Sequence, residues 1–184
     1  MSETVQLTAL CEAILAVAGE PVGVDALVAA AGEGVDRAQV EAALALLVER
    51  HAQPGSGLVV EAVGGGWRLA TRPEHESALR SFLGLRARTR LSQAALETLA
   101  IVAYRQPITL PEVNFLRGVN SAAVLRTLLE RKLVRVAGRK AVVGTPLLYR
   151  TSKEFLVRFG LDSLAALPAV EQVVQETGEA SGGA

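Results

Sequence analysis

The sequence is short of sulfur and of aromatic side chains. It has one cysteine, Cys11, among 184 residues, and only 4% of its residues are aromatic. A single cysteine excludes an intramolecular disulfide, and the apolar helical pattern around Cys11 predicts a small core residue rather than a thiol nucleophile. Because half of the residues are apolar, we expect cores built from Leu, Val and Ala.

Long hydrophobic runs and a secretory leader are also missing. No apolar run reaches the roughly 18 residues of a membrane-spanning helix, and no hydrophobic segment with a basic flank opens the chain. These absences indicate neither membrane spanning nor secretion. We therefore expect a protein of the reducing cytoplasm with no membrane partner.

Residues that build catalytic or metal sites are scarce. His51 and His75 are the only histidines, and neither has further ligands at metal-binding spacing. The glycines at 64–66 lack the Gly-Lys-Ser/Thr continuation of a phosphate-binding loop and lie between strand-like segments, which indicates a hairpin turn. The carboxylates form no pair to which a catalytic role can be given. The sequence predicts no enzyme, no metal and no cofactor.

Charge is balanced overall but unevenly distributed. Residues 1–76 carry 4 basic and 11 acidic side chains, a net charge of −7. Residues 86–153 carry 13 basic and 3 acidic side chains, a net charge of +10, and residues 154–184 have a net charge of −4. This asymmetry predicts that the second half attracts anionic partners and that the first half repels them.

The second half of the chain repeats the organisation of the first. The segment AILAVAGEPVGVDALVAAAG corresponds to TLAIVAYRQPITLPEVNFLRG, with Pro21 aligned to Pro107 and Gly32 to Gly118 at one offset. A period of about 80 residues is too long for a solenoid unit and is typical of two tandem small domains.

In the first half, apolar periodicity predicts helices that end before residue 19 and that span residues 24–30 and 35–50. Residues 58–63 and 67–71 are strand-like and flank the glycine turn, so they predict a hairpin. Thr71 and Glu74 fit a capping box for a closing helix that reaches about residue 83.

The second half predicts the same order of elements. Ser92 fits the N-cap of a helix that ends at about residue 104, and Thr109 with Glu112 fits a capping box for a short helix to about residue 118. Asn120 or Ser121 is expected to cap a third helix to about residue 133. Strands follow over residues 134–137 and 147–150, and Thr151 with Glu154 is expected to cap the last helix.

Three helices, a hairpin and a trailing helix are typical of a winged-helix domain. We therefore predict a mostly α protein with small β-hairpins (α+β) that contains two tandem winged-helix domains. The expected boundaries are an N-terminal domain over residues 1–84, a linker over 85–90, a C-terminal domain over 91–168 and a disordered tail over 169–184.

DNA binding is the main alternative, because a winged helix often places its third helix in the major groove. In the second domain the exposed side of that helix is expected to show Arg126 beside Ala122, Ala123 and Glu130, which is a poor base reader. The remaining basic residues lie in the linker and at the wing, where they could contact phosphates weakly and without sequence preference. These residues are Arg86, Arg88, Arg90, Arg135, Arg139 and Lys140.

A protein-interaction role explains more of the sequence. The helix over residues 92–104 is apolar almost all round even with Leu96 and Leu99 assigned to the core, and such a helix usually contacts neighbours on several sides. Its polar stripe of Glu97, Tyr104 and Arg105 contains typical interface anchors, although Glu97 and Arg105 could also simply pair with each other. In the first domain, the exposed apolar residues suggest self-association: Ala42, Ala45 and Leu46.

Several segments resemble the bacterial segregation and condensation protein B family. They are LSQAALETLAIVAYRQPIT, RGVNSAAVLRTLLERKLV, GRK, PLLYRT and EFLVRFGLDSLAALP in the second domain, with AILAVAGEPV and GGGWRLATRPE in the first. The resemblance covers the chain from about residue 7 to residue 168. The chain departs from the family pattern at Ala122 and Ala123, where Asp-Gly is expected, and at Gly144-Thr145-Pro146, where the wing lacks an expected arginine.

The resemblance implies a non-enzymatic homodimer, paired mainly through its N-terminal domains, that binds the kleisin subunit. Through the kleisin it would act with the structural-maintenance-of-chromosomes ATPase in a condensin-like complex of the nucleoid. Any DNA contact would be indirect, or weak and non-specific. The partner-binding surface implied by the resemblance comprises Glu97, Tyr104, Arg105, Gln106, Arg117, Asn120, Ser121 and Arg126.

Overall fold

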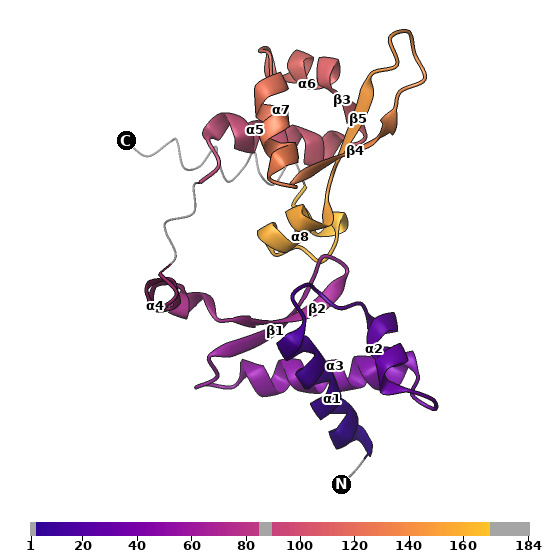
Figure 1. The fold of residues 1–184 in the computed structure, drawn as a ribbon, viewed down its shortest axis with the longest axis vertical. Helices are drawn as coiled ribbons and strands as arrows, with labels where there is room; N and C mark the ends of the chain where they lie inside the picture. The colour runs from indigo at the N-terminus through magenta and orange to yellow at the C-terminus, as the bar shows by residue number, and fades with distance from the viewer. Residues whose placement is uncertain (1–2, 85–89, 170–184) are drawn as a thin grey trace.

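The computed structural model describes residues 3–84 and 90–169. The predicted linker arginines Arg86 and Arg88 and almost all of the predicted tail lie outside these residues. Figure 1 shows the elements as two units, one above the other, each built from helices and a small sheet. The predicted fold class is confirmed: the chain is mostly helical, with antiparallel sheets in a winged-helix arrangement.

The N-terminal unit packs its three helices around a cluster of aliphatic side chains. Its elements are α1 (Glu3–Val17), α2 (Val24–Ala31), α3 (Arg37–Ala52), β1 (Leu58–Val63), β2 (Gly66–Thr71), the 3₁₀ turn η1 (Pro73–His75) and α4 (Glu76–Phe82). Leu15, Leu27 and Leu44 are buried in this cluster, and Cys11 lies among them. Cys11 is buried, so the prediction of a core cysteine is confirmed, and this burial raises the pKa of its thiol.

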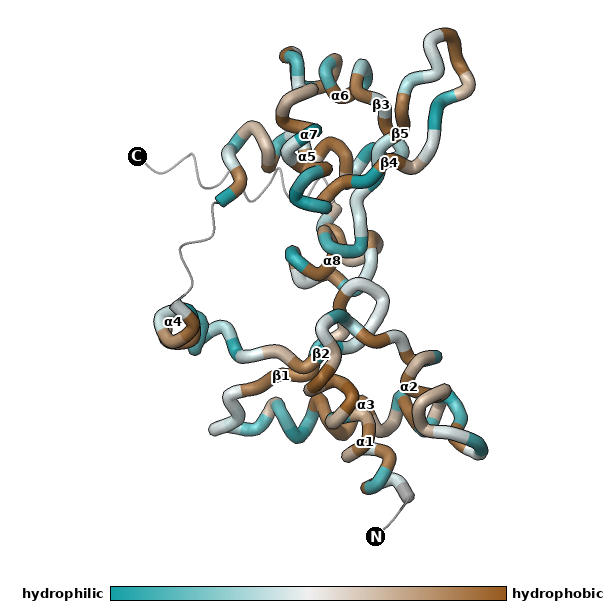
Figure 2. The backbone as a smooth tube through the Cα atoms, in the orientation of Figure 1, coloured by the Kyte–Doolittle hydropathy of each residue, from teal (hydrophilic) through white to brown (hydrophobic). Residues whose placement is uncertain are grey.

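The C-terminal unit has the same order of elements and one additional short strand. Its elements are α5 (Gln93–Arg105), β3 (Ile108–Thr109), α6 (Leu110–Arg117), α7 (Ala122–Glu130), β4 (Val134–Arg139), β5 (Leu147–Thr151), α8 (Lys153–Phe159) and the 3₁₀ turn η2 (Leu164–Ala166). The sheet has the order β3-β5-β4, and all of its pairs are antiparallel. Its core is aliphatic apart from Tyr149 and Phe155. Figure 2 shows hydrophobic stretches along the helices and strands of both units, and also on α4 and at the tip of the loop between β4 and β5.

The predicted capping box of Thr71 and Glu74 is wrong. Thr71 is the last residue of β2 and pairs with Leu58, and the next backbone amide, of Arg72, donates to the Gly57 carbonyl at 3.0 Å. Because the sheet holds Thr71 in extended backbone, the chain enters η1 first, and α4 begins only at Glu76.

Two further local predictions also need correction. Helix α7 ends at Glu130 rather than at residue 133, because Lys132 adopts a left-handed backbone conformation that turns Leu133 into the core. Helix α8 is capped by the Ser152 side chain, which accepts from the Phe155 amide at 3.2 Å, and not by Thr151. The predicted capping residue, Thr151, is thus one position before the actual one, Ser152.

The two units contact each other through the turn of the first hairpin. The amides of Gly64 and Gly65 donate to the carbonyls of Leu161 and Asp162, each at 2.8 Å. A Cβ atom added at Gly64 would lie 3.1 Å from Val157 Cγ2 on α8. The turn therefore lies against the segment that follows α8 and leaves little space for a side chain at Gly64.

Candidate partner-binding surface

Helix α5 has a buried side and a solvent-exposed side, but the division is not the one predicted. Ala95 and Leu99 are buried, whereas Leu96 is exposed, so the assignment of Leu96 to the core is wrong. The buried stripe includes Thr98, whose hydroxyl donates to the Ala94 carbonyl at 2.8 Å. Since that hydrogen bond satisfies the hydroxyl, Thr98 occupies an interior position at little cost.

Tyr104 and Arg105 lie at the exposed C-terminal end of α5. The Tyr104 hydroxyl donates to the Pro168 carbonyl at 2.8 Å, which fixes the ring at the surface. The Arg105 guanidinium makes no hydrogen bond or ion pair with the described residues. An aromatic ring and a charged planar group are thus adjacent at the surface, and both are typical interface anchors.

A shallow groove of about 520 Å³ adjoins Arg105. Its lining comes from the end of α5, from β3 and from α6: Arg105, Pro107, Ile108, Pro111, Glu112, Phe115 and Leu116. Phe115 leaves 87% of its surface exposed, and Leu116 is also exposed. Apolar groups gathered in this way are typical of surfaces that bind a protein segment.

Sequence reasoning missed Phe115 and Leu116. Helix α6 has eight residues and buries only Val113 fully. A helix this short packs one narrow side on the core, so two large apolar residues that follow Val113 by two and three positions extend beyond that side.

Glu112 is the most strongly perturbed carboxylate beside the groove. Its Oε1 accepts from Lys140 Nζ at 2.5 Å, and its Oε2 accepts from the Thr109 hydroxyl and amide at 2.7 and 2.8 Å. The Lys140 hydrogen bond first, and then those from Thr109, lower the pKa of Glu112 from 4.5 to about 2. The predicted capping box is confirmed, and Lys140, predicted as a phosphate contact, is paired inside the domain.

Gln106 has an internal role. Its side-chain oxygen accepts from the Thr151 amide at 2.9 Å and from the Thr151 hydroxyl at 3.0 Å, and its amide donates to the Ala103 carbonyl at 2.9 Å. These bonds connect the end of α5 to the end of β5. They also keep Thr151 buried, which is why Thr151 does not cap α8.

Arg117 is likewise engaged inside the domain. Its side chain is only 12% exposed, donates to the Ala94 carbonyl at 2.7 Å and pairs with Glu97 at 2.9 Å. The alternative in which Glu97 pairs with Arg105 is therefore wrong. Helix α6 supplies the partner of Glu97, because two residues eight positions apart on one helix are more than two turns distant.

The remaining predicted residues lie around the start of α7. Ser121 is buried, while the side-chain oxygen of Asn120 accepts from the Ala122 amide at 3.0 Å. Arg126 is exposed and makes no hydrogen bond or ion pair with the described residues. Of the eight predicted partner-binding residues, Gln106, Arg117 and Ser121 thus form part of the scaffold, and the other five are accessible.

The basic residues proposed as phosphate contacts do not form one surface. Arg139 Nη1 donates to the Thr145 carbonyl at 3.1 Å within the wing, and Lys140 is paired with Glu112. Arg90 and Arg135 are exposed. Because two of the four described residues are held within the wing, little supports a dedicated nucleic-acid site.

The predicted self-association residues are all exposed on α3. Leu46 leaves 45% of its surface accessible, and Ala42 and Ala45 are exposed beside it. A groove of about 340 Å³ between α1 and α3 is lined by Thr4, Val5, Thr8, Leu46, Glu49, Arg50 and Gln53. A second groove, of about 560 Å³, includes Leu7, Leu10, Val35 and Ala42.

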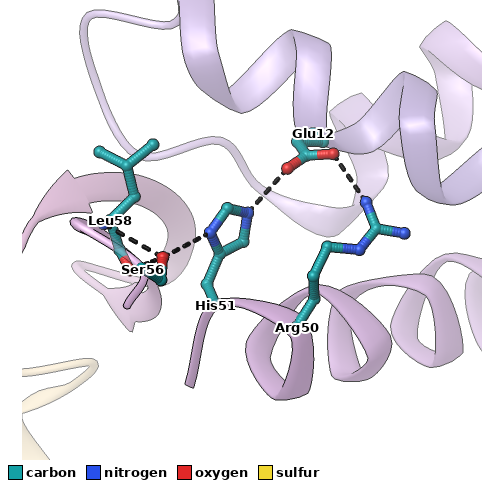
Figure 3. A network of polar contacts seen from close by, with 5 residues as sticks. All are labelled: Glu12, Arg50, His51, Ser56 and Leu58. Atoms are coloured by element: carbon teal, nitrogen blue, oxygen red, sulfur yellow. Dashed lines mark hydrogen bonds and ion pairs between the residues drawn. The ribbon is translucent and has the colours of Figure 1, made fainter. Parts of the chain in front are cut away.

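Figure 3 shows a polar network that joins α1 to the end of α3. His51 Nε2 lies 2.7 Å from Glu12 Oε1, His51 Nδ1 lies 3.3 Å from Ser56 Oγ, and Arg50 pairs with Glu12 at 2.9 Å. The Ser56 hydroxyl donates to the Leu58 carbonyl at 2.9 Å. Because the Ser56 hydroxyl donates to the Leu58 carbonyl and accepts from the Leu58 amide, it is held within its own turn, and we interpret the network as a structural clamp that joins α1 to the end of α3.

Among the described residues, no group of three or more His, Cys, Asp or Glu side chains could hold a metal ion. Over the same part of the chain, no helix combines the length and apolar character needed to cross a bilayer.

Comparison with known proteins gave one consistent family. Residues 9–170 match the family described as segregation and condensation complex subunit ScpB. Segregation and condensation protein B of Syntrophotalea carbinolica is 45% identical over 96% of this chain and 88% of its own length. The protein of the same name from Moorella thermoacetica is 46% identical over 96% and 90%. The crystal structure of ScpB from Mycobacterium tuberculosis is 39% identical, covers 88% of this chain and 99% of its own, and has a TM-score of 0.42.

Proposed function

The chain belongs to the segregation and condensation complex subunit ScpB family, and on this premise we propose that it is a non-enzymatic subunit of a bacterial condensin-like complex. It pairs with a second copy through its N-terminal domain, over residues 1–84. Its C-terminal domain, over residues 91–168, binds a segment of the kleisin subunit. Through the kleisin it acts on the structural-maintenance-of-chromosomes ATPase in the cytoplasm, at the nucleoid.

The observation that carries this proposal is the surface formed by Tyr104 and Arg105 beside the apolar groove. Phe115 and Leu116 are exposed to solvent in the isolated chain, which is unfavourable unless a partner covers them. Arg105 lies at the same groove with no partner of its own among the described residues. A kleisin segment with an apolar residue followed by a carboxylate would fill the groove and pair with Arg105.

The proposed mechanism is steric. An extended kleisin segment becomes ordered when it binds, and the conformational cost is offset by the burial of roughly 1,000–3,000 Å² of surface. The net charge of +10 over residues 86–153 favours an acidic segment and speeds its association. Holding the kleisin in one conformation would alter how the ATPase ring opens.

The experiment replaces both anchors, Tyr104→Ala with Arg105→Ala, and measures kleisin affinity by titration calorimetry. We expect a loss of at least ~1–2 kcal/mol, the usual size for interface anchors, with the unfolding transition little changed. Arg150→Ala is the matched control, because Arg150 is exposed on β5 and does not line the groove. Unchanged affinity in the double variant would move the binding surface to another part of the chain.

Direct DNA binding is the second candidate, and the basic charge of the C-terminal half is what favours it. Such binding would fall steeply with salt, and with little base-reading chemistry on α7 it would be weak and non-specific. Tight, sequence-selective gel shifts by the isolated protein would support a DNA-binding regulator instead of the kleisin-binding role.

A further inference from the structure

Helix α4 leaves its largest apolar side chain exposed and joins neither hydrophobic cluster of the described residues. Figure 1 shows it standing apart from the rest of the N-terminal unit, at the end of the chain that leaves β2. Phe82 leaves 85% of its surface exposed and Leu83 leaves 60%. Neither hydrophobic cluster of the described residues includes a residue of α4. The largest apolar side chains of this segment are therefore uncovered in one protomer.

A segment of this length does not hold a helical conformation alone. Helices shorter than about 12–15 residues are marginal in water without tertiary packing, and α4 has seven residues after the three of η1. The ion pair between Arg80 and Glu76, at 3.7 Å across one turn, contributes only about 0.3–0.5 kcal/mol. The helix needs an apolar surface to cover it.

The same domain has a groove with exposed apolar side chains along it. The groove between α1 and α3 has Val5 and Leu46 exposed along it and Glu49 and Arg50 at its polar edge. Helix α4 likewise combines apolar residues with one acidic and one basic side chain, Glu76 and Arg80. Neither surface has an excess charge that would oppose their contact.

We infer that α4 of one chain docks in the α1–α3 groove of a second copy, and that the second copy's α4 docks in return. The inference rests on the proposed pairing of N-terminal domains and names the contact that forms it. A chain that carries both an uncovered helix and an uncovered groove covers all four surfaces through one two-fold exchange. The two Phe82 side chains alone bury about 300–500 Å², at ~150–250 Å² each.

The charge of the N-terminal domain supports an interface driven by apolar contact. Residues 1–76 have a net charge of −7, so two copies repel each other at long range. Salt screens this repulsion within about 10 Å at 0.1 M. Pairing through α4 therefore strengthens as salt rises, which is opposite to the salt dependence of acidic-segment binding at the C-terminal domain.

The first test measures self-association of the full chain by analytical ultracentrifugation. We expect the combined substitutions Phe82→Ser and Leu83→Ser to raise the dimer dissociation constant at least ~10-fold, as loss of a buried aromatic anchor does. The matched control is Phe115→Ser, because Phe115 has almost the same exposure, 87% against 85%, but lies on the other domain. An unchanged dissociation constant in the double variant overturns the exchange.

The second test places the contact by cross-linking. Cys11 is buried, so engineered cysteines react without competition from it. Mixing a Leu46→Cys chain with a Phe82→Cys chain should give a disulfide-linked pair under mild oxidation, whereas neither chain alone should cross-link well. Efficient disulfide formation between two Leu46→Cys chains contradicts the exchange. An intramolecular disulfide as the sole product of the Leu46→Cys/Phe82→Cys double variant contradicts it as well.

The two tests separate this inference from the proposed function. If the unmodified chain is a monomer at every concentration, the proposed pairing itself fails. If it is a dimer whose dissociation constant is unchanged by the α4 substitutions, the proposed pairing is kept and the exchange of α4 is overturned. If the α4 substitutions weaken kleisin binding but not dimerisation, the kleisin is the ligand of α4 and the exchange is again overturned.

Discussion

At the residue scale, Glu112 shows how one carboxylate supports two functions of the scaffold. Its Oε2 closes the capping box of α6, and its Oε1 holds Lys140 on the neighbouring wing. The hydrogen bond from Lys140 first, and then those from Thr109, favour the ionised form and lower the pKa of Glu112 to about 2.

The lowered pKa of Glu112 predicts a pH-dependent contribution to stability. A depressed carboxylate pKa gives stabilisation that is fully present above 4.5 and is lost as the pH falls through about 2. We expect Glu112→Gln to lower the free energy of unfolding by less than about 1 kcal/mol near neutral pH, because the glutamine oxygen can still accept from the Thr109 amide, as Gln39 accepts from the Asp36 amide at the start of α3. The variant loses the charged pair with Lys140, which solvent screens. In urea titrations the difference from the unmodified chain should close between pH 4.5 and 2.

Glu154→Gln is the control, since Glu154 is exposed on α8 and makes no ion pair with the described residues. A difference between the Glu112→Gln variant and the unmodified chain that stays constant down to pH 2 would contradict this account.

Residue-level patterns in the sequence succeeded where the cause is local. The capping box of Thr109 and Glu112 was predicted because all of its partners lie within one turn. The cap of α8 was assigned to the wrong residue because Thr151 is drawn into hydrogen bonds with Gln106, 45 positions away. Phe115 was missed for a related reason: exposure depends on how little of α6 the core covers, and spacing alone does not give that.

At the element scale, α5 and α6 are joined by one arginine. Arg117 extends from α6 to the Ala94 carbonyl and to Glu97, both on α5. The sequence placed Arg117 on the partner-binding surface because it stands in a family-like motif. The structure assigns it to the helix–helix contact, since most of its guanidinium is covered.

Arg117→Ala should therefore destabilise the C-terminal domain without altering the groove. We expect a loss of about 1–3 kcal/mol in the free energy of unfolding, the cost of leaving partly buried acceptors unpaired. Kleisin affinity should be retained at temperatures where the variant is folded. Thermal denaturation measures the loss of stability, and titration calorimetry at a temperature where the variant is folded measures the kleisin affinity.

The comparison variant is Arg126→Ala, which removes an exposed arginine of the neighbouring helix α7 and should change stability by less than about 0.5 kcal/mol. Equal stability of the two variants would mean that Arg117 is not the connection between α5 and α6.

The order of elements was predicted well from the sequence, because helical and strand periodicities are strong in both halves. The rotation of α5 was not: Leu96 is the larger apolar residue, yet α5 packs against α6 and α7 in a way that buries Ala95 and leaves Leu96 exposed. The position of α4 away from the core was also beyond sequence reasoning, since its pattern is that of an ordinary amphipathic helix.

At the scale of the whole molecule, the glycine turn of the first hairpin is one contact between the two units, and Lys153 Nζ makes another when it donates to the Pro21 carbonyl at 3.4 Å. The backbone amides of the turn are aligned with the carbonyls of Leu161 and Asp162. Gly64 and Gly65 both have positive φ, at 61° and 73°, a conformation that glycine adopts without strain. The sequence predicted the turn but gave no sign that it would contact the other unit.

A side chain at Gly64 should separate the two units. Gly64→Val places a branched group against Val157, where a Cβ alone would already lie at 3.1 Å. We expect small-angle X-ray scattering to show a larger radius of gyration, with the folded content of each unit unchanged by circular dichroism.

Gly65→Val is the matched control, because it imposes similar backbone strain at a position with nothing within 4 Å of the added Cβ. Identical scattering from the two variants would show that strain in the hairpin, and not contact with α8, produces any change.

The two hydrogen bonds at this turn also limit how far the two units of one protomer can move apart. In a pair of chains joined at one end and holding a kleisin segment at the other, they would make each protomer a rigid arm. The distance between the two bound kleisin segments would then depend on how the two units of each protomer are oriented. Such an assembly would accept only attachment points that match its opening.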